Sequence, residues 1–149
     1  MNRIGFVSGY FNPVHAGHIE YFQKAKSLVD HLVVIINNDH QRALKGSAPF
    51  QLQDERLLIV SSIKYVDQAV LSLDQDRTVC KTVESLYRSF EKMYCFNGPK
   101  EYYFINGGDQ SNKSIPEAGI CRELGIKLVD GMGDKVQSSS WLLANRIVG

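Results

Sequence analysis

Short apolar runs alternate along the chain with longer helical patterns, and this alternation constrains the fold more than any other feature. Unbroken runs rich in β-branched and aromatic residues are typical of strands covered on both faces of a parallel sheet. They lie at residues 3–8, 32–37, 68–72, 102–106 and 126–129. The helical patterns lie at residues 17–29, 52–63, 77–93, 115–124 and 138–147. The alternation predicts an α/β fold: a Rossmann-like, doubly wound domain around a five-stranded, mainly parallel sheet.

The size and composition of the chain limit the classes of function. A chain of 149 residues suits one sizeable core, so we expect residues 1–149 to form a single domain. The net charge of +1 gives no general attraction to nucleic acid or to an anionic membrane. Three cysteines, Cys80, Cys95 and Cys121, lack metal or disulfide spacing and suit a reducing cytoplasm. We therefore expect a cytoplasmic protein without nucleic-acid or membrane partners, in which phosphate binding comes from local geometry.

A segment rich in glycine and histidine follows the first predicted strand. Its candidate residues are Gly9, Tyr10, Phe11, Asn12, His15, Gly17 and His18. In α/β proteins phosphates bind at such a strand-to-helix turn, near the positive end of the helix. The two histidines could hydrogen-bond a phosphoryl group and stabilise the charge that grows on it. Ordinary surface or capping histidines are the alternative, and zinc is disfavoured because no Cys or His partner is suitably spaced.

Two basic residues after the second predicted strand could also reach a phosphate. Lys45 precedes Gly46 in residues 38–51, which we interpret as a loop able to cover a ligand. A lysine there could act as a mobile point charge, although a solvated loop lysine is the alternative. Arg56, in the following helical pattern, is a candidate phosphate contact, with a surface ion pair as its alternative.

The remaining candidates follow the fourth strand and open the last helical pattern. They are Gly107, Gly108 and Asp109, and Gln137, Ser138, Ser139 and Ser140. The glycines would let a nucleotide lie against the backbone, and Asp109 could bond a ribose hydroxyl or orient the base. Hydroxyls and free backbone N–H groups at a helix start can cradle the β- and γ-phosphates. A tight turn and a helix cap are the alternative roles.

Together these segments resemble those of the nucleotidyltransferase superfamily, and the resemblance covers nearly the whole chain. His15–His18 is similar to the His-x-Gly-His signature, and Leu44–Gly46 to a loop whose lysine contacts phosphate. Gly107–Asp109 and Ser138–Ser140 resemble the Gly-Gly-Asp and Ile-Ser-Thr/Ser-Thr/Ser segments. Lys64–Asp67 resembles the Arg-Tyr-Val-Asp segment of the cytidylyltransferases.

Some positions depart from this family pattern. Gln137 replaces the apolar first residue of the serine motif, and the family's arginine near the serines has no match. Asn12 stands where the cytidylyltransferases usually have aspartate, and it matches the nicotinate-mononucleotide adenylyltransferases instead. Arg56 matches a family position.

The resemblance implies an enzyme of the cytidylyltransferase-like group. Such an enzyme would transfer CMP or AMP from a nucleoside triphosphate to a phosphorylated small acceptor, such as a sugar or polyol phosphate, and release pyrophosphate. The attacking phosphate is already ionised at neutral pH, so catalysis needs positioning and charge cancellation rather than a general base. The implied catalytic residues are His15, His18 and Lys45, with Mg²⁺ carried by the triphosphate and no metal held by the protein.

Two other readings stay open. One is a nicotinate-mononucleotide-type adenylyltransferase, suggested by residues 11–15, and the other is a nucleotide-binding domain without turnover. A hydride-transferring Rossmann domain is disfavoured because the chain has no Gly-x-Gly-x-x-Gly. We expect a homodimer. The choice between CTP and ATP depends on backbone groups, so no side-chain pattern reveals it.

Overall fold

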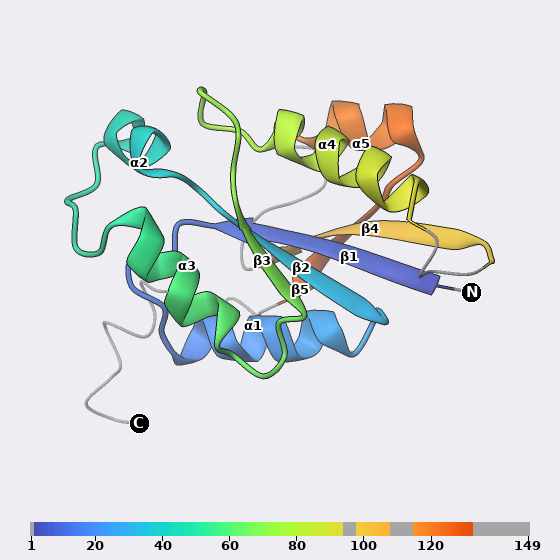
Figure 1. The fold of residues 1–149 in the computed structure, drawn as a ribbon, viewed down its shortest axis with the longest axis horizontal. Helices are drawn as coiled ribbons and strands as arrows, with labels where there is room; N and C mark the ends of the chain where they lie inside the picture. Colours follow the sequence, from blue (N-terminus) through green and yellow to red (C-terminus); the bar gives the residue numbers. More distant parts are fainter. Residues whose placement is uncertain (1, 94–97, 108–114, 133–149) are drawn as a thin grey trace.

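The computed structural model describes residues 2–93, 98–107 and 115–132, which form one five-stranded sheet with helices on both faces (Figure 1). The strands are β1 (Asn2–Gly9), β2 (His31–Ile36), β3 (Gln68–Leu71), β4 (Lys100–Gly107) and β5 (Lys127–Met132). The helices are α1 (Ala16–Lys26), α2 (Asp39–Lys45), α3 (Gln53–Ser61), α4 (Cys80–Glu91) and α5 (Ala118–Leu124). The predicted α/β class and five-stranded sheet are confirmed.

The strands form where the sequence is most uniformly apolar. Every residue from Leu32 to Ile36 in β2 is fully buried, because helices cover both faces of the sheet. The edge strand β3 is only half-buried along its length. All neighbouring strands are parallel, in the order β3-β2-β1-β4-β5.

This strand order determines where a ligand would bind. The chain moves outward from β1 through β2 to β3, and then continues on the other side of β1 with β4 and β5. The order therefore reverses between β1 and β4, and doubly wound folds bind ligands in the crevice at the carboxyl ends of such strands. Gly9 and Gly107 end these two strands.

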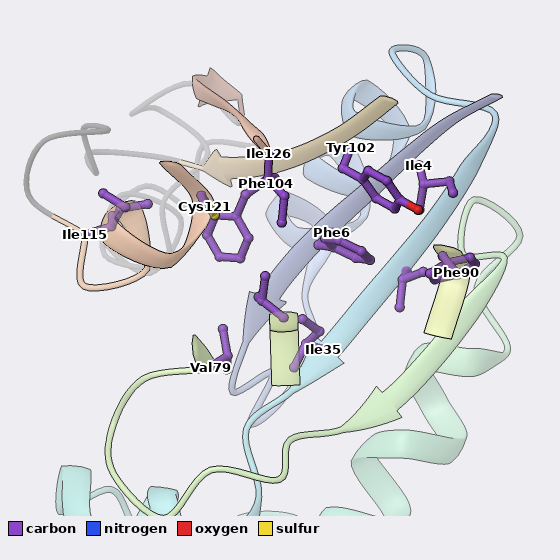
Figure 2. Packing of buried hydrophobic residues seen from close by; sticks show 13 residues of the cluster. Ile4, Phe6, Ile35, Val79, Phe90, Tyr102, Phe104, Ile115, Cys121 and Ile126 are labelled. Carbon is purple, nitrogen blue, oxygen red and sulfur yellow. The ribbon is translucent and has the colours of Figure 1, made fainter. Parts of the chain in front are cut away.

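Side chains alternate between the two faces of the sheet and build two cores. In β1, Ile4 and Phe6 pack toward α4 and α5, whereas Val7 packs toward α1 and α3. Figure 2 shows the first core, in which Ile4 and Phe6 lie with Phe90 of α4. The second core contains Phe22 of α1. In Figure 1 these helix pairs lie on opposite sides of the sheet.

The interpretation of residues 38–51 as a loop is wrong in part, because Asp39–Lys45 forms helix α2. Asn38 caps its first turn by accepting the backbone N–H of Gln41, whose side chain reaches back to Asn38. Gly46 ends the helix with a φ of 85°, a conformation that favours glycine. These cap residues can be recognised in the sequence, because Asn38 and Gln41 are three residues apart and Gly46 follows.

The other predicted elements within the described ranges begin and end within three residues of the observed bounds. The predicted helix at 138–147 lies outside the described residues. No helix in the described ranges is long and apolar enough to cross a membrane.

Candidate active site

The turn between β1 and α1 places two histidine rings side by side. His15 is the N-cap of α1, and its Nδ1 accepts the backbone N–H of Gly17 at 3.0 Å. Nδ1 of His18 accepts the backbone N–H of His15 at 3.2 Å. The rings stack with their centroids 3.8 Å apart. Two imidazoles thus replace the Ser and Glu side chains of an ordinary capping box.

Both imidazoles are uncharged at neutral pH. Burial lowers the pKa of His15 below its usual 6.5. Burial, together with the neighbouring His15, lowers the pKa of His18 to about 4. The edge of the Phe11 ring, 5.0 Å from His18 between centroids, forms part of this apolar surrounding.

The capping contacts determine which ring nitrogen carries the proton. Since Nδ1 of His15 and Nδ1 of His18 each accept an N–H, we assign the proton of each neutral ring to Nε2. An Nε2–H group is the kind of hydrogen-bond donor that stabilises charge on a phosphoryl group. The alternative of capping histidines is therefore confirmed for His15, and it is compatible with the predicted ligand contact.

The backbone before the histidines folds tightly around Phe11. Its φ is 50°, which is rare for a bulky residue, and the residue is only 3% exposed. A Cβ on Gly9 would lie 2.7 Å from Cζ of Phe11, so glycine makes room for this ring. The sequence marks Gly9 as a candidate for ligand contact, and that contact stays a prediction.

Lys45 is the last residue of α2, so its predicted place in a loop is wrong. Its Nζ lies over the ring of Tyr10, 4.4 Å from the ring centroid. Tyr10 directly follows β1, so this contact brings the ammonium group to the same turn that carries the histidines. Within the described residues Lys45 makes no ion pair.

Arg56 of α3 is fully buried, so the alternative of a surface ion pair is wrong. Its guanidinium donates to the carbonyl oxygens of Tyr10, Asn37 and Gln51 and to the carboxylate of Asp39. Burial alone would raise the pKa of Asp39, but the Gln53 N–H and Arg56 outweigh it and lower that pKa. A direct phosphate contact at Arg56 stays a prediction.

Asn12 contacts the segment that follows α2. Its Nδ2 donates to the carbonyl of Ala48 at 2.8 Å, and its Oδ1 accepts the backbone N–H of Gln51 at 2.9 Å. An amide can both donate and accept, whereas an ionised carboxylate can only accept. Neither Gln51 nor Asp39 was a candidate from the sequence, because no local motif marks contacts between segments so far apart.

Only some of the residues predicted to contact a ligand lie within the described ranges. Gly17 is buried in the first turn of α1, and Gly107 ends β4 beside β1. The other candidates lie outside the described residues, so their roles stay predictions: Gly108, Asp109, Gln137, Ser138, Ser139 and Ser140. The described ranges contain no group of three or more His, Cys, Asp or Glu residues that could hold a metal ion.

Comparisons with known proteins point to one family. A family model described as cytidylyltransferase-like matches residues 6–127. The bifunctional protein HldE of Wolinella succinogenes is 32% identical over 130 residues, which are 86% of this chain and 24% of that protein. The FAD synthase of Thermoplasma acidophilum is 38% identical over 76 residues, 51% of this chain and 52% of that protein.

The fold comparison agrees with the sequence comparison. The crystal structure of the lipopolysaccharide core biosynthesis protein from Thermoplasma volcanium GSS1 has a TM-score of 0.67 and 27% identity. The match covers 87% of this chain and 96% of that one. The chain spans about a quarter of the length of the HldE protein it matches.

Proposed function

The chain belongs to the cytidylyltransferase-like family of nucleotidyltransferases, and from this membership we propose that it transfers CMP or AMP from a nucleoside triphosphate to a phosphorylated small molecule. The proposed acceptor is a sugar or polyol phosphate, and the second product is pyrophosphate. FAD contains an adenylyl group joined to a flavin phosphate. The FAD synthase relative therefore supports AMP, as well as CMP, as the group that this chain would transfer.

The observation that carries this proposal is the pair of neutral histidines at the turn after β1. Their Nδ1 atoms accept backbone N–H groups, so each ring carries its proton on Nε2. The turn follows the central strand, next to the point where the strand order reverses. Lys45 adds a positive charge at Tyr10 of the same turn. Donors and cations of this kind suit a polyphosphate substrate.

The proposed reaction needs no nucleophilic side chain. An oxygen of the acceptor phosphate attacks the α-phosphorus in line, and the bond from that phosphorus to the α,β-bridging oxygen breaks. The electron pair leaves with pyrophosphate, and no proton must move because the attacking phosphate is already ionised. His15 and His18 donate to the phosphoryl oxygens on which charge grows, and Lys45 offsets charge on the triphosphate. Mg²⁺ arrives bound to the triphosphate as part of the substrate.

The test is an assay of pyrophosphate release by the purified protein. Each of the four common nucleoside triphosphates is supplied with Mg²⁺ and a panel of sugar and polyol phosphates, with nicotinate mononucleotide as a further acceptor. We expect release that requires both a triphosphate and a phosphorylated acceptor, with CTP or ATP preferred. Tight triphosphate binding without pyrophosphate release for any acceptor would instead indicate a nucleotide-binding domain without turnover. Pyrophosphate release from ATP with nicotinate mononucleotide as the single effective acceptor would indicate a nicotinate-mononucleotide-type adenylyltransferase.

A further inference from the structure

The segment that carries Lys45 is tied to the histidine turn by the side chain of Asn12. This amide bridges two backbone groups after α2: it donates to the carbonyl of Ala48 at 2.8 Å and accepts the N–H of Gln51 at 2.9 Å. Both functions of the amide are used, so the contact depends on asparagine at this position. The bridge joins residues 36 and 39 positions apart in the sequence.

Arg56 holds the same segment from the interior. Its Nε donates to the carbonyl of Gln51 at 3.1 Å. The backbone N–H of Gln51 is therefore held by Asn12 and its carbonyl by Arg56. Nη1 of Arg56 donates to the carbonyl of Tyr10 at 2.8 Å, and also to that of Asn37 at 2.6 Å. The guanidinium thus joins the ends of β1 and β2 to the start of α3. A buried arginine is favourable only when such partners are present.

The start of α2 is anchored as well. Asp39 pairs with Nη2 of Arg56 at 2.8 Å. Its backbone N–H donates to the side chain of Gln53 at 2.9 Å, and its carboxylate accepts the Gln53 N–H at 3.1 Å. Helix α2 is therefore held at its first residue by α3 and just beyond its last turn by Asn12. Lys45, its last residue, stays over Tyr10 as a result.

We propose that Asn12 and Arg56 are positioning residues that hold Lys45 against the histidine turn in the conformation that binds the triphosphate. They act through the backbone of α2 and residues 46–52 and need no contact with the substrate. The role of Lys45 in this statement rests on the proposed function, whereas the brace formed by Asn12 and Arg56 does not.

The decisive variant is Asn12→Asp, which keeps the shape of the side chain but removes the donor to Ala48. We expect kcat/KM for the triphosphate to fall about fivefold to tenfold, as for loss of one hydrogen bond. In a Lys45→Ala background the same substitution should change kcat/KM less than about twofold, because the contact through which it acts is gone. If Asn12→Asp and the uncharged Asn12→Leu both lower kcat/KM by the same factor with and without Lys45, Asn12 acts on the substrate and not through Lys45, and the proposal is overturned. Gln23→Glu, the same chemical change at an exposed position of α1, is the control.

A second readout needs no activity. Backbone hydrogen exchange of residues 46–52, measured by mass spectrometry on the free protein, should be faster in Asn12→Asp and in Arg56→Lys than in wild type and Gln23→Glu. Unchanged exchange in Asn12→Asp would show that the brace is absent. If the wild type shows no nucleotidyl transfer but exchange accelerates as expected, the brace stands and the proposed function fails. If the wild type is active but exchange in Asn12→Asp is unchanged, the proposed function stands and the brace fails.

Discussion

His15 and His18 each use Nδ1 to close the start of α1 and carry the ring proton on Nε2. A charged imidazole would attract phosphate more strongly but would be costly in this half-buried, apolar setting beside Phe11. A neutral pair avoids that cost and still offers two N–H groups in a fixed direction. Preorganised donors of this kind need no rearrangement when charge develops on a substrate.

A substitution of His15 can separate capping from catalysis. Asparagine is a favoured N-cap residue but lacks a donor at the position of Nε2, so His15→Asn should keep the stability of the wild type. Its kcat should fall about a hundredfold, as for loss of one preorganised donor. His15→Ala should lose the same activity and also about 1 kcal/mol of stability. Steady-state kinetics and urea unfolding measure the two effects. Wild-type turnover in His15→Asn would remove His15 from the reaction.

The low pKa of His18 predicts a pH dependence of stability. Its pKa is about 4 in the folded protein and near 6.5 when unfolded, so between these values the unfolded state binds more protons. The stability due to this histidine is therefore complete above pH 6.5 and is lost as the pH falls toward 4. The loss should reach about 3 kcal/mol, at about 1.4 kcal/mol per pKa unit.

Urea unfolding of the wild type and of His18→Gln, at several pH values from 8 to about 4, tests this expectation. The difference between the two proteins removes the contribution of the carboxylates that titrate in both. The variant should lose less stability than the wild type across this range. Equal slopes would mean that His18 is not buried as a neutral ring.

At the scale of elements, α2 is the part of the site that the prediction of a loop over residues 38–51 missed. Its caps, Asn38 with Gln41 and then Gly46, are recognisable signals, and the helix could have been predicted from them. The contacts of Asn12 and Arg56 could not, because they join backbone groups of distant segments and leave no pattern in the residues between them. Arg56 matched a family position, but its buried contacts to carbonyl oxygens follow only from the packed structure.

The position of Lys45 at the end of an anchored helix makes its removal informative. Lys45→Ala should lower triphosphate affinity about tenfold or more, since a hydrogen bond to a charged group is lost. Lys45→Arg should restore only part of it, because a planar guanidinium does not replace a compact ammonium. Binding of each triphosphate by calorimetry, with the exposed Lys24→Ala as control, measures this. Wild-type affinity and rate in Lys45→Ala would place Lys45 outside the site.

At the scale of the whole molecule, the sheet was predictable and the order of its strands was not. Apolar runs such as residues 32–36 mark buried strands by themselves. Strand order depends on which runs pair after folding, and the doubly wound rule supplied only the expectation of a reversal. The reversal lies between β1 and β4, so the carboxyl ends of these neighbouring parallel strands, Gly9 and Gly107, lie at one edge of the sheet. The clustering of the motifs that follow these two strands stays a prediction.

The hydrogen bonds of the two histidines also predict that the protein itself holds no metal at this site. Nδ1 of both histidines is occupied by a backbone N–H, and a protonated Nε2 cannot ligate a metal. We expect protein treated with a chelator to regain full activity when Mg²⁺ and the triphosphate are added together. Elemental analysis should find no stoichiometric zinc. Zinc bound one to one, and lost together with activity on chelation, would contradict this expectation.

The central claim is direct transfer of a nucleotidyl group at the histidine turn, and a triphosphate labelled at its α-phosphorus tests it most directly. With wild-type protein, Mg²⁺ and the acceptor found in the pyrophosphate assay, the label should appear in the acceptor, one for each pyrophosphate released. The label should not attach to the protein when the acceptor is omitted, and transfer should fall about a hundredfold in His15→Asn. A stably labelled protein, or release of the label as free nucleotide without transfer to any acceptor, would contradict the account.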